Sequence, residues 1–140
     1  MKESMDSNIK INTTFEYPFK FSQKDVVTFA EATGDKNPIH LDEEYAKNTL
    51  FKRRILHGFL GGSIFSKVFG TLFPGEGTIY LKQNMSFYKP MFTDVSYKAV
   101  FTIVEIFPKK NRALVRTDII NVDKDIVTTG EALISHKSIS

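Results

Sequence analysis

Hydrophobic and polar positions follow two different periods along the chain, and the period changes near its middle. Residues 12–19 alternate at every second position, which predicts a strand. Apolar residues at helical spacing then predict an amphipathic helix over 23–33, with Ser22 as its N-cap. A second short helix is expected from Asp42 to Lys47, because acidic side chains favour a helix N-terminus.

The most apolar helix is expected from Gly58 to near Leu72. Leucine, isoleucine and valine recur there every four residues, and phenylalanines occupy the other faces. A helix that is apolar all round is typical of a buried position. Gly61, Gly62 and Ser63 are poor helix formers, so their small size predicts the close approach of a backbone or a ligand.

The rest of the chain is rich in strand patterns. Strands are expected over 78–89, 95–107, 113–122 and 126–135, separated by turn-forming residues. One buried helix beside a long antiparallel meander is an α+β arrangement, in which the sheet must wrap the helix to cover its phenylalanines. We expect a single domain behind a polar tail at residues 1–10.

Composition narrows the possible functions. The 140 residues include 13 Phe and no Cys, which excludes disulfides, thiolate metal sites and cysteine nucleophiles. A net charge of +3 is too small to indicate nucleic-acid binding, but it suits an anionic ligand such as coenzyme A or an acidic carrier protein. Without an apolar run of membrane-spanning length or a signal-peptide pattern, the sequence predicts a cytoplasmic protein that does not contact membranes.

The candidate chemistry lies in the run Gly-Asp-Lys-Asn-Pro-Ile-His that begins at Gly34. Gly34 can end a helix in the left-handed conformation, and Pro38 restricts its own backbone and that of the residue before it. Asp35, Asn37 and His40 are therefore held on a short, stiff segment. An isolated Gly-Asp is usually only a turn, but an acid, an amide and an imidazole fixed together suit catalysis by proton transfer.

Further polar candidates flank the start of the apolar helix. His57 is expected to orient the preceding loop or to lie behind the groups that touch a ligand. The Gly58 backbone N–H, at the positive end of the helix, can stabilise an oxyanion. Ser63 and Ser66 lack the Gly-x-Ser-x-Gly pattern of a nucleophile and are expected only to line a pocket. Gln83 is either a satisfied buried amide or a pocket residue.

Two other readings of the charged residues are less favoured. Lys52-Arg53-Arg54 is more often a solvated loop than a phosphate contact, and its role stays open. A metal site built on Asp35 and His40 is rejected, because the sequence offers no clear third ligand.

Four segments resemble the MaoC-like (R)-specific enoyl-CoA hydratase family, also called hydratase 2. They are the run 29–46 around the Gly-Asp-x-Asn-Pro-Ile-His motif, the His-Gly step at 57–58, and the runs 77–81 and 85–90. The resemblance covers most of the chain, and the first motif is fairly specific. Ala32 departs from the pattern, which usually has a larger aliphatic residue or Gly there, and is expected to affect only helix packing.

The resemblance implies a hot-dog fold, in which an antiparallel sheet wraps a central helix and two protomers pair edge to edge as a homodimer. It also implies reversible syn hydration of trans-2-enoyl-CoA to (R)-3-hydroxyacyl-CoA, with no metal or redox cofactor. By resemblance, Asp35 and His40 hold and polarise a water molecule, Asn37 helps to position it, and the Gly58 N–H serves the thioester oxygen.

The same resemblance places the acyl tail along the central helix, where Ser66 and Phe69 would lie beside it. A bulky Phe69 then predicts a preference for short acyl chains. Two alternatives stay open: a (3R)-hydroxyacyl-ACP dehydratase with the same chemistry, and a non-catalytic module that binds acyl thioesters. A hot-dog thioesterase is a weaker possibility.

Overall fold

The structure, a computed structural model, describes residues 9–140. The expected tail at residues 1–10 lies mostly outside the described residues. Ile9, however, is only 7% exposed and packs in the hydrophobic core, and the Lys10 N–H donates to Thr13 Oγ1 over 3.1 Å. This corrects the expected boundary, because the folded domain begins no later than Ile9.

Helices and strands occur in the predicted order. The helices are α2 (Gln23–Thr33), α3 (Pro38–Leu41), α4 (Glu43–Lys47) and α5 (Gly58–Thr71). The strands are β1 (Thr14–Phe19), β2 (Ile79–Gln83), β3 (Ser86–Phe87), β4 (Tyr97–Phe107), β5 (Arg112–Ile120) and β6 (Ile126–Ser135). A 3-10 turn at Pro108–Lys110 joins β4 to β5. None of the helices in this described part of the chain has the length and hydropathy of a membrane span.

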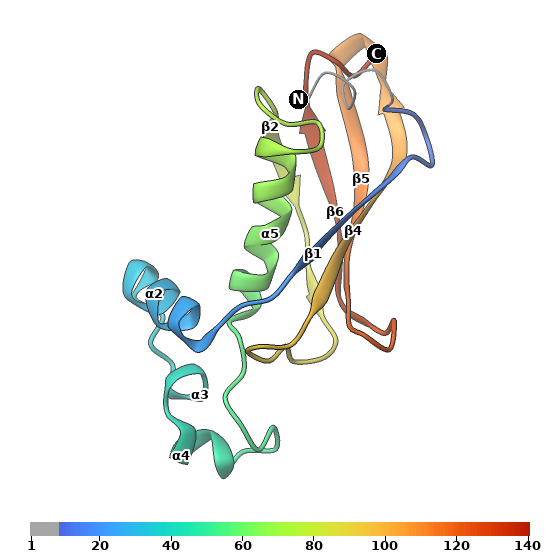
Figure 1. Ribbon diagram of the computed structural model, residues 1–140. Helices are drawn as coiled ribbons and strands as arrows, with labels where there is room; N and C mark the ends of the chain where they lie inside the picture. Colours follow the sequence, from blue (N-terminus) through green and yellow to red (C-terminus); the bar gives the residue numbers. More distant parts are fainter. Residues whose placement is uncertain (1–8) are drawn as a thin grey trace.

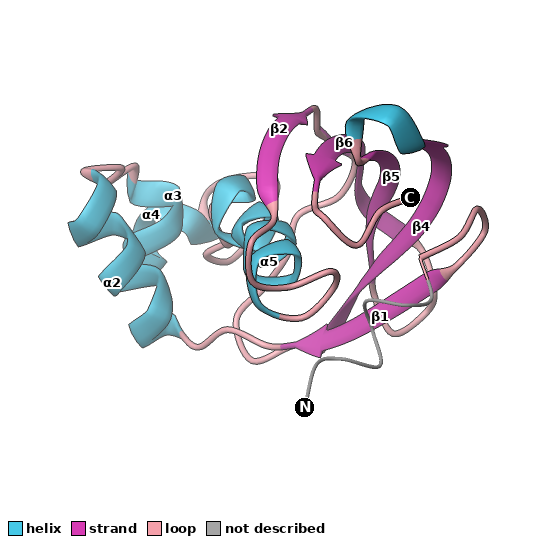
Figure 2. Cartoon of the chain, turned by 90° about the horizontal axis from the view of Figure 1, so that it is seen from above, coloured by secondary structure: helices cyan, strands magenta, loops and turns pink. Residues whose placement is uncertain are grey.

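The strands form one antiparallel sheet that curves around α5. Its order is β1-β4-β5-β6-β2, and β3 also pairs with β6. Figures 1 and 2 show α5 lying in the hollow of this sheet. Phe65 and Phe69 of α5 pack against Phe101 of β4, with ring centroids 5.7 and 5.2 Å apart. The α+β prediction is confirmed, and the arrangement is that of a hot-dog fold.

The helix that leads to the candidate motif has a defined start and end. Ser22 Oγ accepts the Asp25 N–H, and the Asp25 carboxylate accepts the Ser22 N–H, which together form a capping box. Gly34 ends the helix with φ 82°, and its N–H donates to Ala30 O. A residue with a Cβ would be strained at that φ, so the glycine fixes where the chain turns toward Asp35.

The helices α2, α3 and α4 form a helical lobe, residues 23–47, beyond the N-terminal end of α5 and outside the sheet (Figure 1). Asn37 Oδ1 accepts the Ile39 N–H and begins α3, with Pro38 at its first position. Asp42 Oδ1 accepts the Tyr45 N–H and begins α4. The predicted stiff segment is thus a capped single turn of helix, whereas a turn without a helix was expected.

Two expectations from the hydrophobic pattern need correction. The helix α5 is not buried all round, because Phe59 is 67% exposed next to the candidate site. The predicted strand over 78–89 is divided into β2 and β3, with an irregular register between Tyr80 and Lys82. Its alternating apolar residues Ile79 and Leu81 are exposed rather than turned to the core.

Candidate active site

A carboxylate and two imidazoles meet where the helical lobe touches the N-terminus of α5. Asp35 lies in the turn before α3, His40 lies on α3, and His57 is the residue before α5. One side-chain donor atom from each lies within 4.8 Å of the others, and the two imidazole centroids are 3.9 Å apart. The fold therefore brings Asp35 and His40 together, as the motif predicts.

Backbone carbonyls fix the orientation of both imidazoles. His40 Nδ1–H donates to Ile55 O over 2.8 Å, so in the neutral ring Nε2 keeps its lone pair for proton transfer. His57 Nε2–H donates to Asp35 O over 2.9 Å, and its other ring nitrogen is buried without a partner among the described residues. His57 thus holds the backbone of Asp35 in place.

Burial lowers the pKa of His40 from its ordinary value of 6.5, because desolvation disfavours the imidazolium form. The hydrogen bond to Ile55 O opposes this effect by raising the pKa. The charge of His57 lowers it further, and the carboxylate of Asp35 raises it. The net result is a neutral imidazole near neutral pH, which can accept a proton.

The same three side chains form a possible ligand set for a divalent cation. A metal site was not expected because the sequence offered no clear third ligand, and the position of His57 corrects that premise. Each imidazole has one nitrogen committed to a backbone carbonyl, which leaves one nitrogen apiece and the carboxylate. The donor set thus fits a cation, although the same groups serve proton transfer without one.

Gly58 begins α5 and faces the cluster. His57 supplies no side-chain cap, and the N–H groups of Leu60 and Gly61 donate back to His57 O at the start of the helix. The Gly58 N–H therefore stays available at the positive end of the helix, as a donor to an anionic oxygen. A Cβ at Gly58 would lie 2.7 Å from the Phe87 ring, so only glycine fits there without movement.

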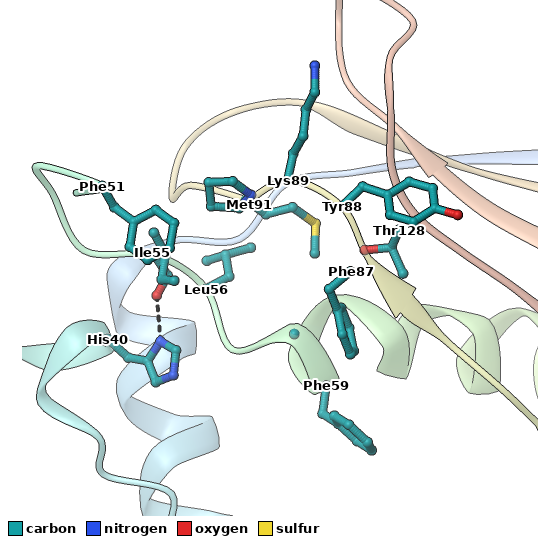
Figure 3. Close-up of a pocket in the computed structure, with 12 residues that line it drawn as sticks. His40, Phe51, Ile55, Leu56, Phe59, Phe87, Tyr88, Lys89, Met91 and Thr128 are labelled. Carbon is teal, nitrogen blue, oxygen red and sulfur yellow. Dashed lines mark hydrogen bonds between the residues drawn. The ribbon is translucent and has the colours of Figure 1, made fainter. Parts of the chain in front are cut away.

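Three cavities meet around Phe59, and Gly58 lines two of them. The Asp35 cavity, of about 290 Å³, is lined by Phe29, Thr33, Asp35, His40, His57, Gly58 and Phe59. The Thr128 cavity, of about 360 Å³, is shown in Figure 3 and is lined by His40, Phe51, Ile55, Leu56, Gly58, Phe59, Phe87, Tyr88, Lys89, Pro90, Met91 and Thr128. The Gln83 cavity, of about 430 Å³, is lined by Phe29, Phe59, Gly62, Ser63, Tyr80, Leu81, Lys82, Gln83 and Met85.

The remaining predicted residues are distributed unevenly around these cavities. Ser63 and Gln83 line the Gln83 cavity. Asn37 caps α3 at the edge of the cluster, with its Oδ1 committed to the Ile39 N–H. Ser66 is exposed and lines none of the three cavities. Phe69 also lines none, and it lies fully buried behind Tyr80, with ring centroids 5.2 Å apart.

The basic loop Lys52-Arg53-Arg54 lies next to the Thr128 cavity, because Phe51 and Ile55 on either side of it line that cavity. Its two arginines have local partners. The Arg53 guanidinium stacks 3.7 Å from the centroid of the Phe92 ring, and Arg54 Nε lies 2.9 Å from a Glu43 carboxylate oxygen. These contacts fix the loop at the rim of the cavity.

Phe59 and Thr128 line the site but were not predicted from the sequence. Phe59 lines all three cavities, yet in the sequence it looks like one more apolar helix residue. Thr128 lies near the start of β6, and only the strand register shows that it pairs with Phe87 of β3 and faces α5. Neither residue left a signal in the sequence, because the exposure of Phe59 and the strand partners of Thr128 are visible only in the folded chain.

A sheet wrapped around an apolar helix, with an acid and an imidazole at the helix N-terminus, defines a hot-dog protein equipped for proton transfer. The model of the MaoC like domain family matches residues 4–125. The chain belongs to this MaoC-like family.

Known relatives share both sequence and fold with this chain. It is 38% identical over 115 residues to a 3-hydroxybutyryl-CoA dehydratase of Methylorubrum extorquens, covering 82% of this chain and 73% of the relative. It is 37% identical over 113 residues to an (R)-specific enoyl-CoA hydratase of Rhodospirillum rubrum, covering 81% and 78%. The solved (R)-hydratase of Aeromonas caviae superimposes with a TM-score of 0.88 at 33% identity, covering 91% of this chain and 97% of that structure.

Proposed function

We propose that this protein is an (R)-specific enoyl-CoA hydratase, which adds water reversibly to trans-2-enoyl-CoA to give (R)-3-hydroxyacyl-CoA. The observation that carries the proposal is the cluster of Asp35 and His40 beside the free N–H of Gly58. Hydration needs a base for water, an acid for C2 and a donor for the thioester oxygen, and these groups supply all three.

The reaction follows from this geometry. A water molecule held by Asp35 and His40 gives up a proton to the cluster as its oxygen bonds to C3. The electrons of the C2–C3 double bond move toward the thioester oxygen, which accepts the Gly58 N–H. A proton from the cluster then reaches C2. Both additions occur on the face of the substrate that meets Asp35 and His40, so syn addition is the expected course.

This chemistry moves only water and protons, so we propose that no metal or redox cofactor takes part and that the coenzyme A thioester is the substrate. Asn37 remains a proposed positioning group for water, because its side-chain N–H₂ is not used by the cap that its Oδ1 forms. In the same proposal, Ser63 and Gln83 contact the acyl group through the Gln83 cavity.

We propose short acyl chains, a homodimer and a cytoplasmic location as the finer features of this function. Tyr80, backed by the buried Phe69, supports the first, because it forms a wall of the Gln83 cavity. The exposed apolar edge strand β2 supports the second, since pairing with a copy would cover Ile79 and Leu81. A cysteine-free chain is compatible with the third.

The decisive experiment follows the ultraviolet absorbance of crotonyl-CoA and determines the configuration of the product. We expect loss of the enoyl absorbance and formation of (R)-3-hydroxybutyryl-CoA. An (S)-alcohol would contradict the proposal, and release of free coenzyme A would indicate a thioesterase instead.

Two alternatives are separated by the same assay. Comparison of crotonyl-CoA with crotonyl-ACP distinguishes a hydratase from a carrier-protein dehydratase, since a strong preference for the protein-bound substrate favours the latter. Binding of both thioesters without turnover would identify a non-catalytic module.

A further inference from the structure

One buried polar group near the site is not explained by the chemistry described above. Thr128 is fully buried, and its hydroxyl has no hydrogen-bond partner among the described residues. A buried hydroxyl without a partner costs about 1–3 kcal/mol of desolvation. Such groups are rare in folded proteins, and one that lines a cavity indicates a ligand group that completes the bond.

The position of Thr128 in the fold directs this hydroxyl into the Thr128 cavity. On β6, Thr128 pairs with Ile119 of β5 and Phe87 of β3, in the middle of the sheet. In Figure 3 the hydroxyl points toward the side of the cavity where Met91 lies. Apart from Lys89, Thr128, His40 and the backbone of Gly58, the lining is apolar or aromatic.

The Thr128 cavity adjoins the cluster of Asp35, His40 and His57, because His40 and Gly58 line both this cavity and the Asp35 cavity. A thioester whose carbonyl oxygen accepts the Gly58 N–H therefore has two ways to extend. One leads into the Gln83 cavity along α5, and the other leads into the Thr128 cavity. The two ends of the substrate differ chemically, and so do the two cavities.

An acyl chain carries no hydrogen-bonding group beyond its reacting carbons, so it would leave the Thr128 hydroxyl unsatisfied. The pantetheine arm on the sulfur side alternates short apolar links with amides, and an amide can either donate to or accept from a hydroxyl. The arm must also lead out to solvent. On that side Lys89, half-exposed and paired with Asp125 over 2.9 Å, lies at the cavity, and the basic loop flanks it.

The geometry points to the Thr128 cavity as the binding site of the pantetheine arm, with Thr128 Oγ1 bonded to the amide nearest the sulfur. This inference rests on the proposed function and goes beyond it, because it assigns the direction in which the substrate lies. The acyl chain then occupies the Gln83 cavity, and the arm leaves past Lys89 and the basic loop.

The test compares three crotonyl thioesters that differ only in the arm: crotonyl-CoA, crotonyl-N-acetylcysteamine, which keeps the first amide, and the S-ethyl thioester, which has no amide. The variant is Thr128→Val, which replaces the hydroxyl by a methyl group of nearly the same shape. We expect kcat/KM to fall about three- to ten-fold for the two amide-bearing substrates, as the loss of one neutral hydrogen bond implies. The S-ethyl thioester should be hydrated at the same rate by both proteins.

Two further variants separate binding from folding. Thr128→Ser keeps the hydroxyl and should retain the ratio of amide-bearing to S-ethyl substrate. Thr129→Val removes the next hydroxyl on β6, which donates to Asp118 outside the three cavities, and should leave the ratio unchanged. Thr128→Val should also raise the Tm of the ligand-free protein, because a buried unsatisfied hydroxyl is removed.

The outcomes also distinguish this inference from the proposed function. Hydration of any of the three thioesters to the (R)-alcohol by the unmodified protein supports the proposed function, whatever the variants show. Equal losses for all three substrates, or no loss for any, overturn the assignment of the arm. Calorimetric binding of butyryl-N-acetylcysteamine and S-ethyl thiobutyrate gives the same comparison without turnover, and an unchanged affinity ratio in Thr128→Val would be equally adverse.

Discussion

At the scale of single residues, the proposed reaction depends on the carboxylate of Asp35 and the neutral imidazole of His40. Asp35→Asn and His40→Gln keep the shape of each group but remove its ability to exchange a proton. We expect either change to lower kcat by roughly 100- to 10,000-fold, with an unchanged circular dichroism spectrum.

Asp42→Asn is a matched control for these variants. Asp42 belongs to the same lobe, and asparagine can replace it as the N-cap of α4, so the activity should stay near normal. Near-normal turnover by Asp35→Asn or His40→Gln would remove the basis for the proposed mechanism.

The lowered pKa of His40 gives a prediction for the pH profile. A base must be neutral, so kcat/KM should fall as the pH drops through the pKa of His40 in the free enzyme. Because burial lowers that pKa, the midpoint of the acid limb should lie below 6.5. The same shift makes the fold gain stability with rising pH up to 6.5, since the unfolded chain binds the proton more tightly. An acid limb centred above 6.5 would contradict the environment described for His40.

Phe69→Ala tests what limits the acyl chain. Loss of this buried ring should destabilise the protein by about 3–5 kcal/mol in chemical denaturation. If Phe69 supports Tyr80 as the wall of the Gln83 cavity, the octenoyl-to-crotonyl ratio of kcat/KM should rise. Phe65 is equally buried and packs on the same Phe101 ring, but the ring contact with Tyr80 is made by Phe69, so Phe65→Ala should lose stability without changing that ratio. Equal use of both chain lengths by the unmodified protein would rule out the short-chain proposal.

At the scale of elements, the two ends of α5 respond differently to a methyl group. No atom lies within 4 Å of a Cβ built at Gly70, so Gly70→Ala should stabilise the protein by about 0.5–1 kcal/mol through helix propensity. A Cβ at Gly58 meets the Phe87 ring at 2.7 Å, so the ring, the strand that carries it or the helix N-terminus must shift.

Gly58→Ala should therefore lower kcat/KM at least about ten-fold, because misplacing an oxyanion donor costs that much or more. Parallel unfolding curves and assays of Gly58→Ala and Gly70→Ala check both expectations. Equal activity of the two variants would show that the position of the Gly58 N–H does not matter for catalysis.

Much of the element structure was accessible from the sequence. The boundaries of α2 follow from the Ser22 cap and Gly34, and β6 follows from its alternating pattern and the turn before it. The irregularities of this segment were missed, because its alternation is continuous in the sequence. In the sheet the register shifts inside β2, between Tyr80 and Lys82, and β3 then continues along β6 in the register that β2 has at Gln83. Periodicity reports which faces are apolar, but it does not report which partner strand each residue meets.

The part of the candidate site whose residues lie close together in the sequence was predictable. Asp35 and His40 lie on one short motif, so their proximity could be predicted from the sequence. The role of His57 as a donor to Asp35 O needed the path of the chain between them, and Thr128 needed the order of the sheet. Residues that join a site through tertiary structure alone leave no pattern in the sequence around them.

At the scale of the whole molecule, the edge strand β2 sets the expected assembly. Leu81→Glu places a charge on that edge and should shift a homodimer toward monomer in sedimentation at micromolar concentration. Leu50→Glu is the matched control, because Leu50 is 82% exposed, lies in the loop after α4 rather than on β2, and should have no effect. An active monomer of the unmodified protein would refute the proposed dimer.

The helical lobe has a consequence for how such proteins diverge. Asp35 and His40 both reach the site from this lobe, while the sheet and α5 supply most of the two apolar cavities. Substitutions confined to residues 34–40 can therefore abolish proton transfer and leave most of the Thr128 and Gln83 cavities intact. A descendant of this chain could become a receptor for thioesters by drift in one short segment, without passing through an unfolded ancestor.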